Sequence, residues 1–315
     1  YPLVAPCLGR YNEPMRGYAI PAIQLDKETT VEAVTTVFEK VNQGGVKLTV
    51  FELLTAKFAG DRRYFEEAGH AFRLREYWNE ARERLEDHSV LDGFEEDDFL
   101  QAVSLVSTIG SGTATTARKD DILRMRLEEF RKWAPEVIDA LVWSATFLDG
   151  EHIHSTRDLP YPKQIVPLAA IRVVHGADTD AYGLRKKLRR WFWSGILGEL
   201  YGSAIETRFA RDVEQVPNWA RGVEGAVTPR TVEDAYFNES RLHTLRTRNS
   251  AAYKGIYALM MTHDVRDWIY NQPFDKADYL QLSVDIHHIF PKAWCGKNNV
   301  PWERRESIIN KTPLA

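Results

Sequence analysis

The amino-acid sequence predicts a mainly α-helical protein with a small α/β section at its N-terminal end. Apolar residues recur at helical spacing through most of residues 61–220, which indicates a helical middle region. A strand-like run at residues 18–25 precedes a helical pattern that begins near Thr30, and this order gives the first section its α/β character. Near the C-terminus, an apolar alternation over residues 284–289 predicts one more strand.

Composition limits the class of protein. The chain has 315 residues, of which 44% are hydrophobic, so it can form packed cores and is expected to contain two domains. Its formal net charge is −4, so any contact with nucleic acid must come from a local patch. Cys7 and Cys295 are too few for a disulfide framework and fit a reducing, cytoplasmic setting. Because no run of about 18 apolar residues is present, no membrane partner is expected.

The first helices are indicated by their ends. The helix from Thr30 is expected to end at Asn42-Gln43-Gly44-Gly45, because glycine can adopt the left-handed cap conformation without strain. Thr49 and Glu52 then have the spacing of a capping box, which predicts a second helix as far as about Ala59.

The helical middle region begins with an acidic segment and ends at a linker. Residues 61–98 carry 13 acidic residues against six arginines, which is typical of a solvated face. Further helical patterns cover residues 99–109, 122–147 and 165–174, and an aromatic-rich segment follows at 188–201. The stretch at 222–229 contains glycine and proline and is the predicted linker, which divides the chain into domains at 1–222 and 223–315.

Three short motifs in this region carry weak functional signals. Residues 110–113 are glycine-rich but lack the Lys-Ser/Thr of a phosphate-binding loop, so a plain loop is expected. His152 and His154 have no third ligand nearby in the sequence, which favours a surface loop over a metal site. The basic run at 185–190 precedes Trp191 and fits either a phosphate-contacting helix or, as the favoured interpretation, an amphipathic helix with a wet basic side.

A stretch without acidic residues, 240–263, contains Arg241, Arg246, Arg248 and Lys254. Cations without compensating carboxylates repel one another, and this repulsion is destabilising unless an anionic partner offsets it. Two interpretations follow. Either these side chains contact the DNA backbone, or they pair with the acidic segment at 61–98 and hold the two domains together.

The strongest signal is the run Asp285-Ile286-His287-His288-Ile289-Phe290-Pro291, with Asn310 downstream. Because successive residues of a strand point to opposite faces, a strand here would direct His287 and His288 to opposite sides. Phosphodiester hydrolysis needs a base to activate water and a cation to stabilise the leaving oxygen. Adjacent histidines can supply both functions, and an asparagine on a following loop can hold either the base or the loop in place.

This stretch resembles the HNH, or ββα-metal, nuclease motif. The resemblance implies His288 as the general base, His287 as a metal ligand and Asp285 as a carboxylate at or beside the metal, with Mg²⁺ or Mn²⁺ as the cofactor. It implies Asn310 as the middle asparagine of the motif, which we count among the catalytic positions. A final Asn or His ligand is expected further along than Ala315. We therefore expect the chain to be a piece of a longer protein, incomplete at the end of its nuclease domain.

The resemblance extends over nearly the whole chain. The segments at 37–45 and 48–54, together with Leu159-Pro160-Tyr161 and Arg190-Trp191-Phe192-Trp193, are similar to a ParB-like NTPase family with a helical part. Combined with the C-terminal motif, this is the layout of GmrSD-type modification-dependent restriction enzymes and of phosphorothioate-sensing SspE nickases. The fold implied is a remnant of the NTPase core, a helical middle and a partial ββα-metal motif.

The same resemblance implies a nucleotide site. A nucleoside triphosphate, with GTP as one candidate, would lie beside Asn42, Gly44 and Gly45. The alternative for these three residues is a plain helix cap.

The function implied is that of an NTP-regulated, metal-dependent DNA endonuclease, a nickase of bacterial antiphage restriction. Its expected partner is double-stranded DNA, with a DNA modification as a candidate signal and a homodimer as a candidate assembly. One alternative is a DNA-binding regulator that keeps the HNH scaffold without cleavage. Another is a helical interaction module whose histidine pair is structural, which predicts no binding of divalent metal.

Overall fold

The computed structural model describes residues 48–203, 205–247, 249–263 and 285–314, together with residues 265, 266 and 271. It describes the backbone alone for Ala177, Asp285, Ile286, Pro313 and Leu314. The chain divides into two compact units, Tyr1–Lys47 and Leu48–Ala315. The predicted N-terminal strand, helix and glycine turn belong to the first unit and lie outside the described residues.

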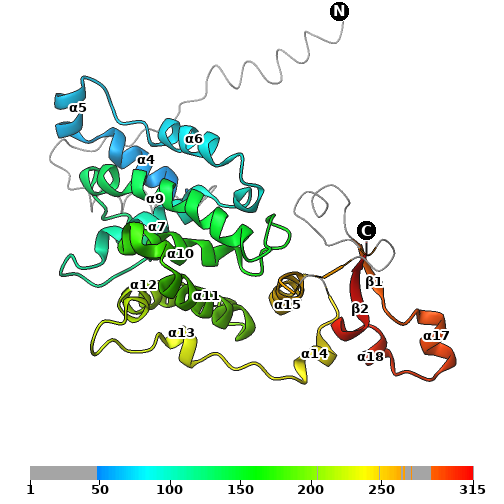
Figure 1. Ribbon diagram of the computed structural model, residues 1–315. Helices are drawn as coiled ribbons and strands as arrows, with labels where there is room; N and C mark the ends of the chain where they lie inside the picture. The colour runs from blue at the N-terminus through cyan, green and yellow to red at the C-terminus, as the bar shows by residue number, and fades with distance from the viewer. Residues whose placement is uncertain are drawn as a thin grey trace, which may run out of the picture. The chain divides into compact units, whose positions relative to one another are not determined.

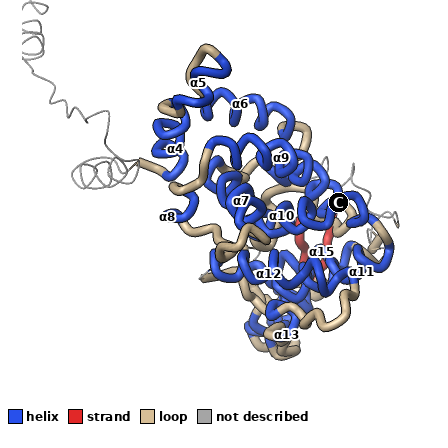
Figure 2. Tube along the Cα trace, turned by 90° about the vertical axis from the view of Figure 1, so that its left-hand side faces the viewer, coloured by secondary structure: helices blue, strands red, loops and turns tan. Residues whose placement is uncertain are grey.

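Helices account for most of the described part of the second unit, so the prediction of a mainly α fold is confirmed (Figures 1 and 2). The predicted helices at 99–109, 122–147 and 165–174 correspond to α7, α9 and α10. We call residues 48–233 the helical body. Its helices are α4 (Val50–Ala59), α5 (Arg62–Ala68), α6 (Leu74–Leu85), α7 (Glu96–Thr108), α8 (Lys119–Ile122), α9 (Leu127–Asp149), α10 (Ile165–His175), α11 (Tyr182–Leu197), α12 (Ile205–Arg221) and α13 (Arg230–Glu233), with 3₁₀ turns η3 (Ser89–Leu91), η4 (Pro162–Gln164) and η5 (Gly176–Asp180).

Helix α10 lies at the centre of the helical body, because it packs against α7, α9 and α12. Every residue from 165 to 171 is buried, and a helix that is apolar on all sides is stable only inside a core. Aromatic side chains of the neighbouring helices extend this core, with the rings of Trp78 and Phe99 stacked at 5.1 Å and Phe130 edge-on to Phe99 at 6.0 Å. Among the described helices, none is both long enough and apolar enough to cross a membrane.

The start of the helical body follows the predicted capping box. Thr49 Oγ1 accepts a hydrogen bond from the Glu52 N–H at 3.2 Å, and the Glu52 carboxylate accepts one from the Thr49 N–H at 2.8 Å. Asp97 then accepts a hydrogen bond from the Phe51 N–H at 3.2 Å, which attaches α4 to the start of α7. The capping box and the hydrogen bond to Asp97 therefore fix together where α4 begins.

The acidic segment at 61–98 is largely the solvated face that the sequence predicts. Most of its arginines pair with nearby carboxylates, as Arg62 does with Glu66 at 2.8 Å and Arg73 with Glu76 at 2.7 Å. Asp98 is an exception, because its carboxylate is buried and receives Lys163 Nζ at 2.5 Å. This pair joins the start of α7 to the turn before α10.

The basic run at 185–190 belongs to α11, and the structure favours the amphipathic interpretation. Trp191, Phe192 and Trp193 are buried on the inner side of the helix. Arg189 contacts Glu151 at 2.6 Å, and the Trp193 indole N–H donates to the same buried carboxylate at 2.8 Å. Lys187 likewise donates to the Trp219 carbonyl at 2.7 Å, so both Lys187 and Arg189 make contacts within the helical body.

The prediction of a surface loop for both His152 and His154 is wrong for His154. The His154 imidazole is buried and lies 2.7 Å from the Asp149 carboxylate at the end of α9. His152 adopts a positive φ of 58°, so the turn places the two side chains in different surroundings. A backbone reversal of this kind has no clear signature in the sequence.

Two further helices, α14 (Arg241–Thr244) and α15 (Ala251–Met261), connect the helical body to the end of the chain. The irregular segment at 222–229 exists as predicted, but α13 beyond it packs against α11 and α12, so the main core continues past residue 222. Helix α15 crosses α11 at Gly255, where an added Cβ would lie 2.5 Å from the Ile196 side chain. Only glycine permits this close approach.

The last described segment, residues 285–314, is called here the terminal module. It contains β1 (Asp285–His288), α17 (Lys292–Lys297), α18 (Trp302–Arg305), the 3₁₀ turn η6 (Ile308–Asn310) and β2 (Lys311–Leu314). The two strands pair antiparallel, with His287 opposite Thr312 and His288 opposite Lys311. A small second core joins Ile308 to Leu245, Ala252 and Tyr253 around the start of α15. The strand predicted around the two histidines is thus found at β1.

Candidate functional site

The two neighbouring histidines of β1 have different surroundings, as the alternation of a strand requires. The His287 side chain is exposed, and no hydrogen bond or ion pair joins it to the residues that the structure describes. The His288 side chain is only 20% exposed. The His287 imidazole therefore faces solvent, while the His288 imidazole packs against other residues of the terminal module.

A carboxylate that sequence reasoning missed holds His288. Glu306 follows α18 directly, and its Oε2 lies 3.2 Å from His288 Nε2. Arg305 Nε donates to Glu306 Oε1 at 3.0 Å, and Lys292 Nζ lies 3.9 Å from that oxygen. Burial raises the pKa of Glu306, but the hydrogen bonds from His288 and Arg305 and the charge of Lys292 outweigh it and lower that pKa below its usual value. Glu306 is therefore ionised near neutral pH.

The sequence contains only a faint signal for Glu306. It is the acidic residue in Arg304-Arg305-Glu306-Ser307, and nothing in its spacing from His288 indicates that the two meet. They meet because β1 and β2 pair and the residues between them turn back across the end of β1.

Asn310 holds the loop and not the imidazole. Its Oδ1 accepts from the Phe290 N–H at 2.8 Å, and its Nδ2 donates to the carbonyls of Phe290 and Arg305 at 3.1 and 2.9 Å. The Ile289 N–H also donates to the Asn310 carbonyl at 2.9 Å. Of the two arrangements that the sequence left open, these hydrogen bonds match the second, in which the asparagine holds the loop. It fixes the turn that follows His288.

The predicted metal ligands are only partly described. His287 offers an exposed imidazole without a described partner, which fits a ligand position. For Asp285 the structure gives the backbone alone, paired with Leu314 across the sheet. Glu306 is already surrounded by three nitrogen donors, so its charge is compensated without a metal. Within the described part of the chain, no group of three His, Cys, Asp or Glu side chains converges in a way that could hold a metal ion.

The four predicted DNA contacts do not form one described patch. Arg241 makes two contacts with the Glu199 carboxylate, at 2.9 and 3.1 Å, and so attaches α14 to the end of α11. Lys254 donates to the Leu159 carbonyl at 3.2 Å, which ties α15 to the helical body. Arg241 and Lys254 thus hold parts of the chain together, although Glu199 and Leu159 lie outside the predicted acidic segment.

Arg246 has a different environment, and Arg248 lies outside the described residues. The Arg246 guanidinium lies 4.4 Å from the centre of the Trp302 ring, and its backbone carbonyl accepts a hydrogen bond from Lys311 Nζ at 3.1 Å. Arg246 therefore packs against the terminal module. The predicted nucleotide contacts Asn42, Gly44 and Gly45 lie in the part of the chain that is not described.

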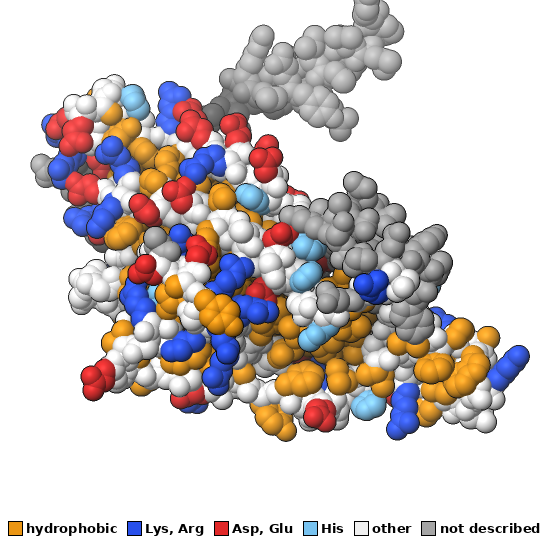
Figure 3. Space-filling model, viewed as in Figure 1, with side chains coloured by type: hydrophobic (Ala, Val, Ile, Leu, Met, Phe, Trp, Pro, Cys, Tyr) orange, Lys and Arg blue, Asp and Glu red, His pale blue; other side chains and the backbone are white. Residues whose placement is uncertain are grey.

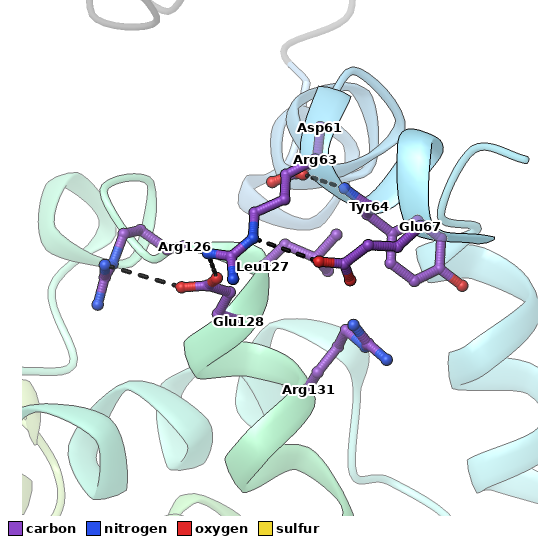
Figure 4. Close-up of a pocket in the computed structure, with 8 residues that line it drawn as sticks. All are labelled: Asp61, Arg63, Tyr64, Glu67, Arg126, Leu127, Glu128 and Arg131. Atoms are coloured by element: carbon purple, nitrogen blue, oxygen red, sulfur yellow. Dashed lines mark hydrogen bonds and ion pairs between the residues drawn. The ribbon is translucent and has the colours of Figure 1, made fainter. Parts of the chain in front are cut away.

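A hollow of about 400 Å³ lies between α5 and the start of α9 (Figure 4). Arginine and glutamate side chains face one another across it, and Arg63 contacts both Glu67, at 3.3 Å, and Glu128. Arg126 lies 3.9 Å from Glu128. Because these charges compensate one another, we assign no ligand to this hollow.

Comparisons with known proteins relate the chain to an archaeal protein whose name gives no function. No protein-family model matches the chain. The chain is 25% identical over 313 residues to the uncharacterized protein MJ0686 of Methanocaldococcus jannaschii. The match covers 94% of this chain and 49% of that protein, so the chain spans about half the length of this relative.

Proposed function

We propose that the terminal module hydrolyses phosphodiester bonds in DNA with the help of a divalent metal ion, as an HNH-type nickase. The observation that supports this most directly is the contact between His288 and Glu306 at the edge of a two-stranded hairpin. The exposed His287, next to His288 in the strand, and the turn fixed by Asn310 also support the proposal.

His288 is suited to act as the general base. Its Nε2 faces the Glu306 carboxylate, which favours the tautomer with the proton on that nitrogen and leaves the Nδ1 lone pair free. Nδ1 can then take a proton from a water molecule that attacks phosphorus. The carboxylate also stabilises the imidazolium that forms, as a hydrogen-bonded acid does for a catalytic histidine.

His287 is the described side chain that would hold the metal ion. The ion would supply charge stabilisation at the leaving oxygen. Imidazole nitrogen binds first-row transition metals more readily than Mg²⁺, so Mn²⁺ fits this ligand better than Mg²⁺ does.

The regulatory part of the proposal rests on the sequence resemblance. We infer an NTPase-type N-terminal region that binds a nucleoside triphosphate near Asn42, Gly44 and Gly45, and a role in the restriction of foreign or modified DNA. These are proposals for the whole protein. The chain itself aligns with about half of its archaeal relative.

Nicking of supercoiled plasmid in Mn²⁺ tests the proposal. His288→Ala should lower the nicking rate on the order of a hundredfold or more, the usual worth of a general base. His70→Ala is the matched control, because His70 is an exposed histidine of the helical body. Nicking that survives in a folded His288→Ala protein would remove this assignment, and plasmid binding without nicking by the wild type would favour the non-cleaving regulator.

The metal role of His287 has its own signature. His287→Ala should weaken Mn²⁺ binding, measured by calorimetry, and excess Mn²⁺ should partly restore nicking, because mass action refills a weakened site. Excess Mn²⁺ should not restore nicking in His288→Ala. Wild-type Mn²⁺ affinity in His287→Ala would contradict the ligand role.

A further inference from the structure

Aromatic rings lie exposed on the terminal module, which also contains the histidine strand β1. Phe290 and Trp294 are 52% and 46% exposed, and their ring centres lie 4.9 Å apart. Trp302 is 52% exposed and carries the Arg246 guanidinium over its ring. Single exposed apolar side chains are ordinary, but a group of large rings in a module of 30 residues marks a binding surface.

The same surface carries uncompensated positive charge. The terminal module has five Lys or Arg residues against three Asp or Glu, a net charge of +2 in a chain whose net charge is −4. Lys297 and Arg304 are exposed and make no ion pair with any residue that the structure describes. The arginines of the acidic segment behave differently, since Arg63, Arg75 and Arg84 all pair with carboxylates. Hydrophobic and basic side chains lie next to one another where Figure 1 draws α17 and α18 (Figure 3).

This surface is continuous with the His288 site. Phe290 is two residues beyond His288, and Asn310 bonds to both its N–H and its carbonyl. Lys292 lies between Phe290 and Trp294 in the sequence, and its Nζ is 3.9 Å from Glu306, the partner of His288. A ligand that covers the two rings would therefore lie next to the histidine.

We propose that Phe290 and Trp294 stack on unpaired nucleobases of a DNA strand whose phosphates meet Lys297 and Arg304. A single strand offers both features that the surface requires, namely flat apolar faces and a regular row of negative charges. In a duplex the faces of the bases are already stacked on one another. The inference rests on the proposed function and refines its substrate to DNA with single-stranded character beside the nick site.

The test is equilibrium binding of the intact protein in EDTA to a fluorescein-labelled single strand and to the matching duplex. Trp294→Ala and Phe290→Ala should each lower single-strand affinity by about tenfold and leave duplex affinity nearly unchanged, because each removes a stacking ring. Tyr182→Ala is the matched control, since Tyr182 is an aromatic residue of α11 that is 84% exposed. It should bind both DNAs as the wild type does.

Several outcomes would overturn the inference. Unchanged single-strand affinity, or an equal loss for strand and duplex, would exclude stacking on unpaired bases. Unchanged affinity with a smaller sedimentation coefficient would assign the rings to contact with a second copy of the chain, and unchanged affinity with a lower melting temperature would assign them to packing.

The experiment also separates this inference from the proposed function. Ring-dependent binding of single strands by a protein that never nicks DNA would retain the inference and remove the nuclease. Nicking that requires His288 but is unchanged by Trp294→Ala and Phe290→Ala, on gapped as well as intact duplex, would retain the nuclease and remove the inference.

Discussion

The helical body and the terminal module are stabilised in different ways. The body has a large shared core that includes fully buried rings such as Phe99, Phe130 and Trp191, and most of its ion pairs are exposed. Among the described residues of the terminal module, the buried apolar side chains are Cys295 and Ile308. The rest of the module depends on polar contacts to its own backbone.

This difference has a functional meaning. The polar groups that hold the module, Asn310 and Glu306, are also the groups that orient His288 and the turn after it. In the helical body, buried polar groups such as Asp212 hold helices to one another. Removing a polar group should therefore affect global stability in the body and the local geometry of the site in the module.

The largest effect is expected in the helical body, at Asp212. The hydroxyls of Tyr201 and Thr231 donate to its carboxylate at 2.5 and 2.6 Å. Burial raises the pKa of Asp212 to about 6, and these hydrogen bonds only partly oppose the rise. The folded protein then holds this proton more tightly than the unfolded chain, whose aspartates titrate near pH 4.

The contribution of Asp212 to stability should accordingly be greatest below about pH 4 and should fall by about 3 kcal/mol as the pH rises through about 6. Urea unfolding at a series of pH values checks this, with Asp212→Asn as the comparison. The free energy of unfolding of the wild type, relative to that of Asp212→Asn, should fall as the pH rises over that window and then level off. A pH dependence that is the same in both proteins would show that Asp212 does not titrate in this way.

The next effect is local to the terminal module. Asn310→Ala removes three hydrogen bonds to the Phe290 and Arg305 backbone. Opening of the hairpin should become easier by about 2 kcal/mol, because the freed backbone groups lose partners in a partly buried turn. Hydrogen exchange should therefore accelerate over residues 285–314 while the helical body keeps its protection.

Asn298→Ala is the matched control for that experiment. Asn298 is an exposed asparagine of the same module whose side chain donates to the Trp294 carbonyl at 2.9 Å. Its replacement should change exchange very little. Equal exchange in the two variants would mean that Asn310 does not stabilise the module.

The smallest effect is expected at Arg241, in the segment that follows the helical body. Its pair with Glu199 is about 40% exposed on both sides, so Arg241→Ala should lower stability by less than about 1 kcal/mol. Because the guanidinium is already paired, the slope of log DNA affinity against log salt should stay unchanged. If Arg241 contacts a phosphate instead, filter binding over a salt series will show that slope reduced by about 0.9.

The same contrast explains how much of the molecule could be predicted from sequence. Apolar periodicity located α7, α9 and α10, and the Thr49–Glu52 pair located the start of α4, because these signals are local. The strand at His287 and His288 was also predicted, from its apolar frame.

The missing parts depend on contacts between residues far apart in the chain. Glu306 meets His288 only because β1 and β2 pair, and Arg241 meets Glu199 only because α14 returns to the end of α11. His154 was placed at the surface because nothing local indicated that the turn at His152 directs it inward. Charge patterns in the sequence show that a residue needs a partner, but they do not show which one.

The central claim is that His288 and Glu306 act as one unit in phosphodiester cleavage. A double-mutant cycle of nicking rates in Mn²⁺ tests it directly, with wild type, His288→Ala, Glu306→Gln and the double variant. Glu306→Gln should cost about 10- to 100-fold, as loss of an orienting partner usually does. The double variant should be no slower than His288→Ala alone, because Glu306 acts through the imidazole. A double variant whose loss equals the product of the two single losses would contradict the claim.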